Sequence, residues 1–340
     1  MKFMIGYQLT ENQDFVSEII QNKSHIYEVY FSWGKMPNGR NSVLINKSFT
    51  QMEAQERLVD DLKILSKNGI ALNLLLNGNC YGRLSLAKSF FQEVGDTIDH
   101  IQNRFSLVSI TTTSPILARF VKDNFSQLEV RASVNMGIGT IRGMDYVGDV
   151  FDGYYMQREY NRDISHITQL KKWCAANRKK LYLLANSGCL NNCSAHVFHD
   201  NLVSHETEIS QMDNITHFTG ICWDYLKNKH RWISLIRDTS YIRPEDIGLY
   251  EGLFDAVKLA TRVNNNPIRV LKAYINGSYR GAVTELCEPD FSSTLYPFIL
   301  DNISMDGFGE HVLRCEKNCE NCSYCEHMLE KALIDLSNKY

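Results

Sequence analysis

The sequence predicts a single (β/α)8 barrel of the TIM type, and three observations support this fold class. Short β-rich runs alternate with helical segments along the first 186 residues, and a further strand and helix follow at 254–274. Several runs are apolar on both faces, which is typical of a parallel sheet covered by helices. Eight runs can be identified, and eight parallel strands can close into a barrel. The expected strands are residues 2–8, 26–33, 70–76, 105–111, 128–134, 151–156, 180–185 and 254–260.

The helices between these strands have recognisable starting points. Residues 48–67 place leucines on one face, and Ser48 with Gln51 matches a capping box at the start of this helix. Ser114 precedes Pro115, and proline is favoured at the first position of a helix. Two further helices are expected over residues 161–177 and 267–274.

Two segments lie outside this repeat, and both carry cysteines. An insert at 186–253 separates the seventh strand from the eighth, and a tail at 276–340 follows the last helix. The barrel with its insert is expected to span residues 1–275, and the tail is expected to be a metal-binding extension packed on it. The composition supports a large core, because 44% of the residues are hydrophobic and 22% are charged.

The charge and the cysteine content restrict the possible functions. The net charge is −3, which argues against a broad nucleic-acid-binding surface. No apolar run is long enough to cross a bilayer, and the start of the chain lacks the apolar core of a signal peptide. A cytoplasmic protein without a membrane partner is therefore expected. Disulfides are rare in that reducing compartment, so the ten cysteines are expected to bind metal or to act in catalysis.

The densest cysteine cluster lies in the tail. Its pattern is Cys315-x3-Cys319-x2-Cys322-x2-Cys325, so four thiols lie within eleven residues. Thiolates bind both zinc and iron–sulfur clusters. Zinc ribbons separate their two cysteine pairs by a longer stretch, so the compressed spacing favours a 4Fe-4S cluster over zinc. The first three cysteines also match the spacing of radical S-adenosylmethionine enzymes, although those enzymes carry it after the first barrel strand.

A second set of cysteines is expected at the rim of the barrel. Cys189 and Cys193 directly follow the seventh strand, and residues after the strands of such barrels face the active site. Cys80 ends the third strand, and Cys222 lies in the insert with the pair. These four thiols predict a second four-thiolate site, with packing roles for Cys80 and Cys222 as the alternative. The two remaining cysteines, expected to be structural, are Cys174 and Cys287.

Polar side chains at the same rim are candidates for catalysis. Arg158 and Arg262 follow the sixth and eighth strands, and two arginines there can bind a carboxylate or a phosphate. Glu159 and His196 are candidates for an acid or a base. Each of these side chains has an ordinary alternative as a salt-bridge partner or a loop-packing residue. Other histidines of the insert that can replace a thiol as a ligand are His199, His205 and His217.

The chain resembles the collagenase-like peptidases of family U-32. The resemblance is carried by the series of βα units, by the cysteine pair after the seventh strand, and by two segments. Residues 242–246 (IRPED) precede the eighth strand, and residues 257–262 (VKLATR) are similar to the family's fKIxGR strand, with Thr261 in place of glycine. It covers residues 1–275, and Cys189 and Cys193 are closer together than in the family's cysteine signature.

Several members of this family are oxygen-independent hydroxylases of ribosomal RNA, transfer RNA or the ubiquinone ring, and they hold a 4Fe-4S cluster on four cysteines. The resemblance implies that Cys80, Cys189, Cys193 and Cys222 hold such a cluster, with the tail quartet as an additional one. The first expectation is therefore an iron–sulfur enzyme that acts on a peptide, an RNA or a small aromatic molecule and uses an electron donor. A metal-dependent peptidase and a zinc-stabilised binding protein are the alternatives.

Overall fold

The computed structural model describes residues 1–39, 48–209 and 220–337, and it contains a closed barrel of eight parallel strands. The expected (β/α)8 fold is therefore confirmed. Each strand pairs with its neighbours in sequence order, and β8 closes the barrel by pairing with β1. The strands are β1 (Phe3–Gly6), β2 (Ile26–Phe31), β3 (Leu72–Leu76), β4 (Leu107–Thr112), β5 (Glu129–Ala132), β6 (Gly153–Tyr155), β7 (Lys180–Leu184) and β8 (Ala256–Leu259).

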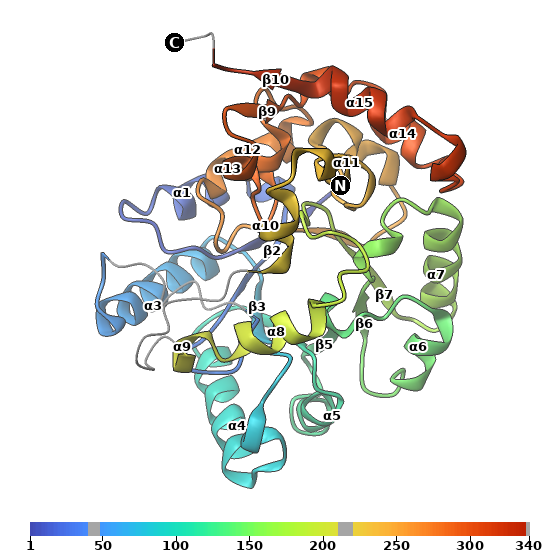
Figure 1. The fold of residues 1–340 in the computed structure, drawn as a ribbon. Coiled ribbons are helices and arrows are strands. Elements are labelled where there is room, and N and C mark those ends of the chain that lie inside the picture. Colours follow the sequence, from blue (N-terminus) through green and yellow to red (C-terminus); the bar gives the residue numbers. More distant parts are fainter. Residues whose placement is uncertain (40–47, 210–219, 338–340) are drawn as a thin grey trace.

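Helices surround this barrel and connect its consecutive strands (Figure 1). Their apolar faces pack on the outside of the sheet, for example through Leu58 and Leu62 of α3 and Ile98 of α4. Burial of such side chains stabilises the fold by about 25 cal/mol per Å² of apolar surface. The helices of this layer are α1 (Asp14–Gln21), α3 (Gln51–Lys67), α4 (Lys88–Gln102), α5 (Pro115–Asn124), α6 (Ile141–Tyr146), α7 (Ile164–Ala176) and α12 (Pro267–Asn276).

The start of α3 differs from the sequence-based expectation. The helix begins at Gln51 with a capping box formed by Thr50 and Glu53, so the box expected at Ser48 and Gln51 is wrong. The Thr50 hydroxyl accepts the Glu53 N–H at 3.3 Å, and the Glu53 carboxylate accepts the Thr50 N–H at 2.8 Å. A charged carboxylate at this position also interacts favourably with the helix dipole, which glutamine cannot do.

Two other helix starts follow the capping signals of the sequence. Ser114 caps α5 by accepting the Leu117 N–H, with Pro115 at the first position as expected. Helix α7 begins at Ile164 rather than at residue 161, because the Asp163 side chain caps it. The segment before Asp163 is thereby released from the helix and runs along the rim of the barrel.

The interior of the barrel is polar as well as aromatic. Arg131 of β5 is 1% exposed and forms an ion pair with Glu28 of β2. Ser109 donates to the same carboxylate at 3.2 Å, and the Asn73 amide donates to Ser109 at 2.6 Å. The guanidinium carbon of Arg131 also lies 4.6 Å from the ring centroid of Tyr182. These interior charges are therefore paired and hydrogen-bonded, as burial requires.

The insert and the tail share a second hydrophobic core. Leu235 and Ile236 of the insert are buried with Phe291, Met305 and Phe308 of the tail, and β9 pairs with β10 in an antiparallel sheet. Figure 1 shows the tail elements gathered on one side of the barrel. The helices of the insert are α8 (His196–Ser204), α9 (Glu206–Ile209), α10 (Ile221–Leu226) and α11 (Ser234–Arg237). The tail contains α13 (Ser292–Leu295), β9 (Phe298–Leu300), α14 (Phe308–Val312), α15 (Tyr324–Ala332) and β10 (Leu333–Asp335).

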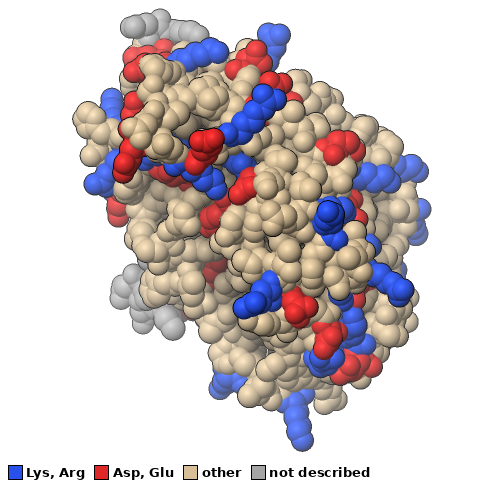
Figure 2. Space-filling view, turned by 90° about the vertical axis from the view of Figure 1, so that its right-hand side faces the viewer, with Lys and Arg blue, Asp and Glu red and all other residues tan. Residues whose placement is uncertain are grey.

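The surface carries charges of both signs. On the face shown in Figure 2, lysines and arginines are interspersed with aspartates and glutamates. That mixture differs from the continuous basic surface that is typical of nucleic-acid-binding proteins. Among the residues that the structure describes, no helix has both the length and the hydropathy needed to cross a bilayer.

Candidate functional site

The loop after β7 is held between other segments at the C-terminal rim of the barrel. The Asn186 side chain donates to the Leu286 carbonyl at 2.8 Å. The Gly188 N–H donates to the Glu288 carbonyl at 3.0 Å. A Cβ at Gly188 would lie 2.3 Å from the Pro289 carbonyl oxygen, so the close approach of the two backbones requires glycine. The cysteines that follow Gly188 therefore stand on a fixed backbone.

Three thiols of the insert come together at this rim. Cys189 and Cys193 lie in the fixed loop, Cys222 lies in α10, and all three are partly exposed. Burial, and then the neighbouring thiols of Cys189 and Cys193, raise the pKa of Cys222 to about 11. His199 of α8 lies beside them. A Cβ built at Gly220 would be 3.2 Å from the Cys222 sulfur and 3.6 Å from the His199 ring.

Cys287 is a further neighbour of this loop. It is buried, and its Cβ lies 3.1 Å from the position that a Cβ at Gly188 would occupy. Burial and then the Asp290 carboxylate raise the pKa of Cys287, and the Cys189 thiol adds to this effect. The sequence predicts only a structural role for Cys287, because nothing in the spacing connects it with Cys189.

Cys80 has different neighbours from those expected for the fourth thiol. A hydrogen bond with His205, and then one from the Gly82 N–H, lower the pKa of Cys80, and the same contact with Cys80 raises the pKa of His205. The second ring nitrogen, Nδ1, lies 3.1 Å from the Glu208 carboxylate. Ser204, at the end of α8, accepts the Cys80 N–H at 3.4 Å. The structure thus groups Cys80 with an imidazole and a carboxylate, and its role as a ligand stays a prediction.

Arg158 and His196, both predicted site residues, contact each other. Arg158 follows β6 in the 3-10 helix η4 (Arg158–Tyr160), and it is 8% exposed. Its guanidinium contacts the His196 Nε2 and donates to the Ser187 hydroxyl at 3.4 Å. His196 Nε2 also lies 3.0 Å from the Asp200 carboxylate, one turn along α8. Helix α8 therefore crosses the rim of the barrel with an imidazole–carboxylate pair against the arginine (Figure 1).

Glu159 and Arg262 occupy other parts of the rim. Glu159 is partly buried in η4, and it forms no hydrogen bond or ion pair within the described residues. Arg262 is 8% exposed, and its guanidinium carbon lies 5.7 Å from the ring centroid of Tyr30. A Cβ at Gly6 would lie 2.7 Å from the Arg262 Cγ, so the glycine that ends β1 makes room for the arginine.

The four tail cysteines form a more exposed group. Cys319 and Cys322 are exposed, whereas Cys315 and Cys325 are partly buried. Burial, and then the thiols of the other three cysteines, raise the pKa of Cys325 to about 11. Lys317 has left-handed backbone geometry, with φ of 58°, and its N–H donates to the Cys315 sulfur at 3.4 Å. Hydrogen bonds to sulfur of this kind tune metal centres that are held by thiolates.

Both cysteine groups have the donor chemistry of metal sites. Within the described ranges, no three His, Cys, Asp or Glu side chains already have the geometry of an assembled site. In each group the neighbouring thiols nevertheless raise the pKa of one cysteine, Cys222 or Cys325. Thiolates are preferred ligands of zinc and of iron–sulfur clusters. His217, one of the predicted alternative ligands, lies outside the described residues.

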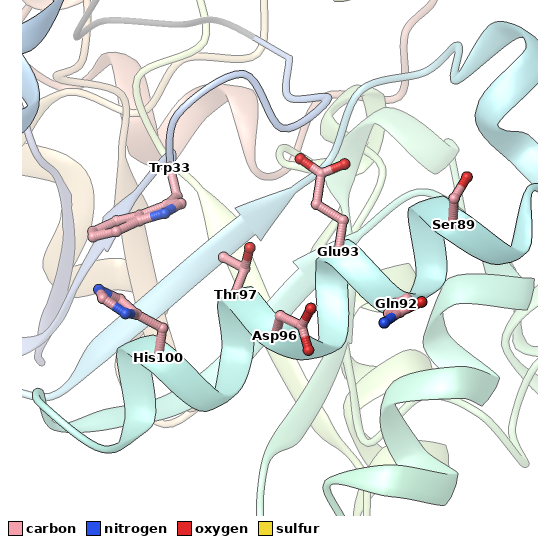
Figure 3. A pocket seen from close by; sticks show the side chains of 7 residues that line it. All are labelled: Trp33, Ser89, Gln92, Glu93, Asp96, Thr97 and His100. Carbon is pink, nitrogen blue, oxygen red and sulfur yellow. The ribbon is translucent and has the colours of Figure 1, made fainter.

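A pocket of about 490 Å³ contains neither cysteine group. The rings of Trp33, after β2, and His100, of α4, lie across it from each other, with their centroids 5.7 Å apart (Figure 3). Its lining has no cysteine or arginine, and active sites of such barrels stand at the strand ends. We therefore assign the candidate site to the rim. The remaining lining residues are Ser89, Gln92, Glu93, Asp96 and Thr97.

Comparisons with known proteins give two similarities. No known protein-family profile matches the chain. The chain is 26% identical over 323 residues to an uncharacterized protease of Methanocaldococcus jannaschii, and the match covers 92% of this chain and 90% of that protein. A solved structure of a U32 peptidase has a similar fold, with a TM-score of 0.52 and 14% sequence identity over 76% of this chain and 91% of that one.

The two similarities support different conclusions. At 14% identity, the U32 peptidase structure shows a shared fold. The archaeal protease matches more of the chain than the barrel alone, so this similarity extends into the tail. The chain therefore shares its barrel fold with a U32 peptidase and is similar over most of its length to a protein named as a protease.

Proposed function

We propose that the protein is an iron–sulfur enzyme that performs an oxygen-independent hydroxylation or a related redox reaction at the C-terminal rim of its barrel. The observation that supports this proposal most is that Cys222 of α10 neighbours Cys189 and Cys193, which lie on the fixed loop after β7. Chemistry in this fold is built on the loops that follow the strands. The proposed substrates are a peptide, an RNA or a small aromatic molecule. A hydroxylation that takes its oxygen from water removes two electrons from the substrate and requires an electron acceptor, whereas a reductive reaction at the same site requires the electron donor expected from the sequence.

The three grouped thiols would hold a 4Fe-4S cluster with a fourth protein ligand. Cys80 is the ligand expected from the sequence, and His199 and Cys287 are the side chains next to the grouped thiols. Once bound, such a cluster would exchange electrons with the substrate or coordinate it directly. The tail quartet would hold a second centre, either an iron–sulfur cluster or zinc.

The polar residues of the rim would position the substrate and move its protons. Arg158 presents a planar set of donors that suits a carboxylate, a phosphate or a carbonyl oxygen. Asp200 fixes the orientation of the His196 ring at 3.0 Å, so that this imidazole can give or take a proton at a defined place. Helix α8 contacts Arg158 through His196, and it would limit the access of water to a bound substrate.

Metal analysis after anaerobic purification tests this proposal. We expect a brown protein that contains iron and acid-labile sulfide in equal amounts. Cys222→Ala should lower both, while the matched Cys174→Ala variant should keep them, because Cys174 is buried in α7 against Met144. A colourless protein with stoichiometric zinc, or full iron content in Cys222→Ala, would contradict the proposal.

A thiol peptidase is the second candidate, and it is favoured by the contact of Cys80 with His205 and Glu208. In that reaction the Cys80 sulfur would attack the peptide carbonyl, and His205 would give its proton to the leaving amine. Water would then hydrolyse the thioester. The name of the archaeal relative is compatible with hydrolysis. A metal-dependent peptidase has less support, because four-thiolate sites leave no position open for water.

Peptide cleavage separates the two candidates. If the protein is a thiol peptidase, Cys80→Ser should abolish hydrolysis of a peptide library, and Glu208→Gln should slow it. Iodoacetamide should then block activity by alkylating Cys80 in the absence of iron. If the protein is a redox enzyme, the iron-free protein should show no hydrolysis that depends on Cys80.

A further inference from the structure

Lys258 of β8 is a buried amine inside the barrel that belongs to neither cysteine group. It stands level with Met4 of β1 and Leu184 of β7, and it is 6% exposed. Its Nζ lies 4.1 Å from the ring centroid of Tyr30 and 4.8 Å from that of Tyr155. An ammonium group is attracted to such aromatic faces, but the faces provide no oxygen or nitrogen acceptor for its three N–H donors.

The structure gives this amine no acceptor in the part of the chain that it describes. Neither tyrosine offers its hydroxyl to Lys258. The Tyr30 hydroxyl donates to the Leu259 carbonyl at 2.7 Å, and the Tyr155 hydroxyl lies 2.9 Å from the Met4 sulfur. An ammonium group in the barrel interior without a protein acceptor has all three N–H donors available to a ligand that enters from the rim.

A second cation lies beside the amine. Arg262 is placed on the same tyrosine ring as Lys258. The interior carboxylate Glu28 is already bound by Arg131, which leaves Glu288 as the other carboxylate with an electrostatic effect on Lys258. Lys258 and Arg262 therefore place two cations on one tyrosine ring, at the end of the barrel interior that meets the rim.

We propose that Lys258 and Arg262 together bind an anionic group of the substrate, a carboxylate or a phosphate. The oxygens of the anion would supply the acceptors that the ammonium lacks, and its charge would be attracted by both cations. The guanidinium would bind the anion in a planar, two-point geometry, and the tyrosine rings would hold the amine in place. This inference rests on the proposed function in one respect, namely that the proposed function places the substrate at the rim. Anion binding itself requires no metal.

The protonation of the amine agrees with this role. Burial, and then repulsion from Arg262, lower the pKa of Lys258 to about 7, against the opposing effects of Glu28 and Glu288. A bound anion would favour the charged amine and raise this pKa again. The empty and occupied states of the site would therefore differ in the charge of Lys258.

Titration of sodium acetate and of inorganic phosphate, at constant ionic strength and followed by calorimetry, tests the proposal. We expect saturable binding of at least one anion. Lys258→Met and Arg262→Gln should each weaken it by about tenfold or more, as expected for loss of a charged hydrogen bond. Lys180→Met is the matched control. Lys180 begins β7 at the other end of the barrel, where it pairs with Glu129, so its loss should leave anion binding unchanged. Tighter binding of phosphate would indicate a phosphorylated substrate, and tighter binding of acetate a carboxylate.

Thermal unfolding shows whether a loss of anion binding in these variants comes from a loss of folding. Lys258→Met replaces a buried charge by an apolar side chain of similar length, so its Tm should be equal to or above that of the native protein. Lys180→Met should lower the Tm, because it breaks an ion pair. Unchanged anion affinity in Lys258→Met, absence of saturable binding, or a Tm lower than that of Lys180→Met would overturn the proposal. Neither measurement depends on iron or turnover, so failure of the redox proposal would leave this test intact.

Discussion

The two cysteine groups have the same local pattern in different surroundings. Each contains two cysteines separated by three residues, and each of these loops includes a non-glycine residue in the left-handed region, Asn192 with φ of 55° and Lys317 with φ of 58°. The loop at the rim is fixed by isolated β-bridges to residues 239 and 288. The tail loop has two exposed cysteines and lies outside the barrel.

This difference indicates two roles for similar chemistry. At the rim, backbone hydrogen bonds already hold the loop, so the loss of one thiol should affect activity more than folding. In the tail, the ligands converge only in the folded state, so metal affinity contributes directly to folding free energy. Position relative to the barrel, rather than the spacing of the cysteines, therefore separates a reactive centre from a stabilising one.

The largest expected effect concerns the rim. Cys193→Ala should abolish activity and remove about half of the iron, because each four-ligand set binds one cluster. The tail centre should keep its spectrum, and the Tm should change little, because the loop remains bridged to residues 239 and 288. Iron analysis, activity and thermal unfolding check this, with Cys174→Ala as the control. Unchanged iron in Cys193→Ala would show that only the tail binds a cluster.

The second prediction concerns the tail, where we expect the loss of one cysteine to lower the stability of the fold as well as the metal content. Cys322→Ala removes an exposed thiol that contributes little to packing. If the quartet binds a metal, this change should lower the metal content and reduce the Tm by roughly 5–10 °C, through loss of the metal's contribution to folding. Metal content and Tm should fall together in Cys319→Ala as well. Full occupancy in both variants would exclude the quartet as a site.

The barrel could be predicted from the sequence because its elements depend on local patterns, whereas the tail quartet stays a prediction as a metal site. Strands that are apolar on both faces follow from periods of a few residues, and so do the caps of α5 at Ser114 and Pro115. The box at Thr50 was missed because the overlapping pair at Ser48 and Gln51 fits the same pattern. Local sequence patterns therefore predict which helices and strands are present, but they place the ends of these elements only to within a few residues.

The groupings at the rim could not be predicted, because loops from distant parts of the chain create them. Cys287 comes beside the Cys189 loop through the backbone pairing of residues 187 and 288, and no spacing rule connects these positions. Cys80 meets His205 only because α8 folds back over the rim. One signal was available for the interior. Glu28 interrupts an otherwise apolar strand, and a buried acid requires a partner such as Arg131.

The third prediction concerns the pH dependence of the free energy of unfolding, which should change when Lys258 of the barrel is replaced but not when a tail cysteine is replaced. Lys258 has a pKa of about 7 in the folded protein, below its ordinary value of 10.5. Between these two values the unfolded chain binds more protons than the folded one, so the free energy of unfolding rises with pH across this window. The contribution of Lys258 is about 1.4 kcal/mol per pH unit. Lys258→Met should lose this slope in urea unfolding at pH 7, 8 and 9, whereas Cys322→Ala should keep it. An identical slope in native protein and Lys258→Met would refute the assignment.

The smallest expected effect compares the two left-handed residues. A lysine in this region is strained because its Cβ approaches the following carbonyl oxygen, whereas asparagine tolerates it through local hydrogen bonds. Glycine removes the strain but increases the entropy of the unfolded chain. For Lys317→Gly the relief of backbone strain is larger than the effect of the added entropy of the unfolded chain, so the free energy of unfolding should rise by about 0.5 kcal/mol. For Asn192→Gly the two effects should nearly cancel. Urea unfolding of both variants with metal bound measures the difference. If Asn192→Gly instead destabilised the protein and lowered its iron content, the asparagine side chain would contribute to the rim site itself, because relief of backbone strain cannot produce that result.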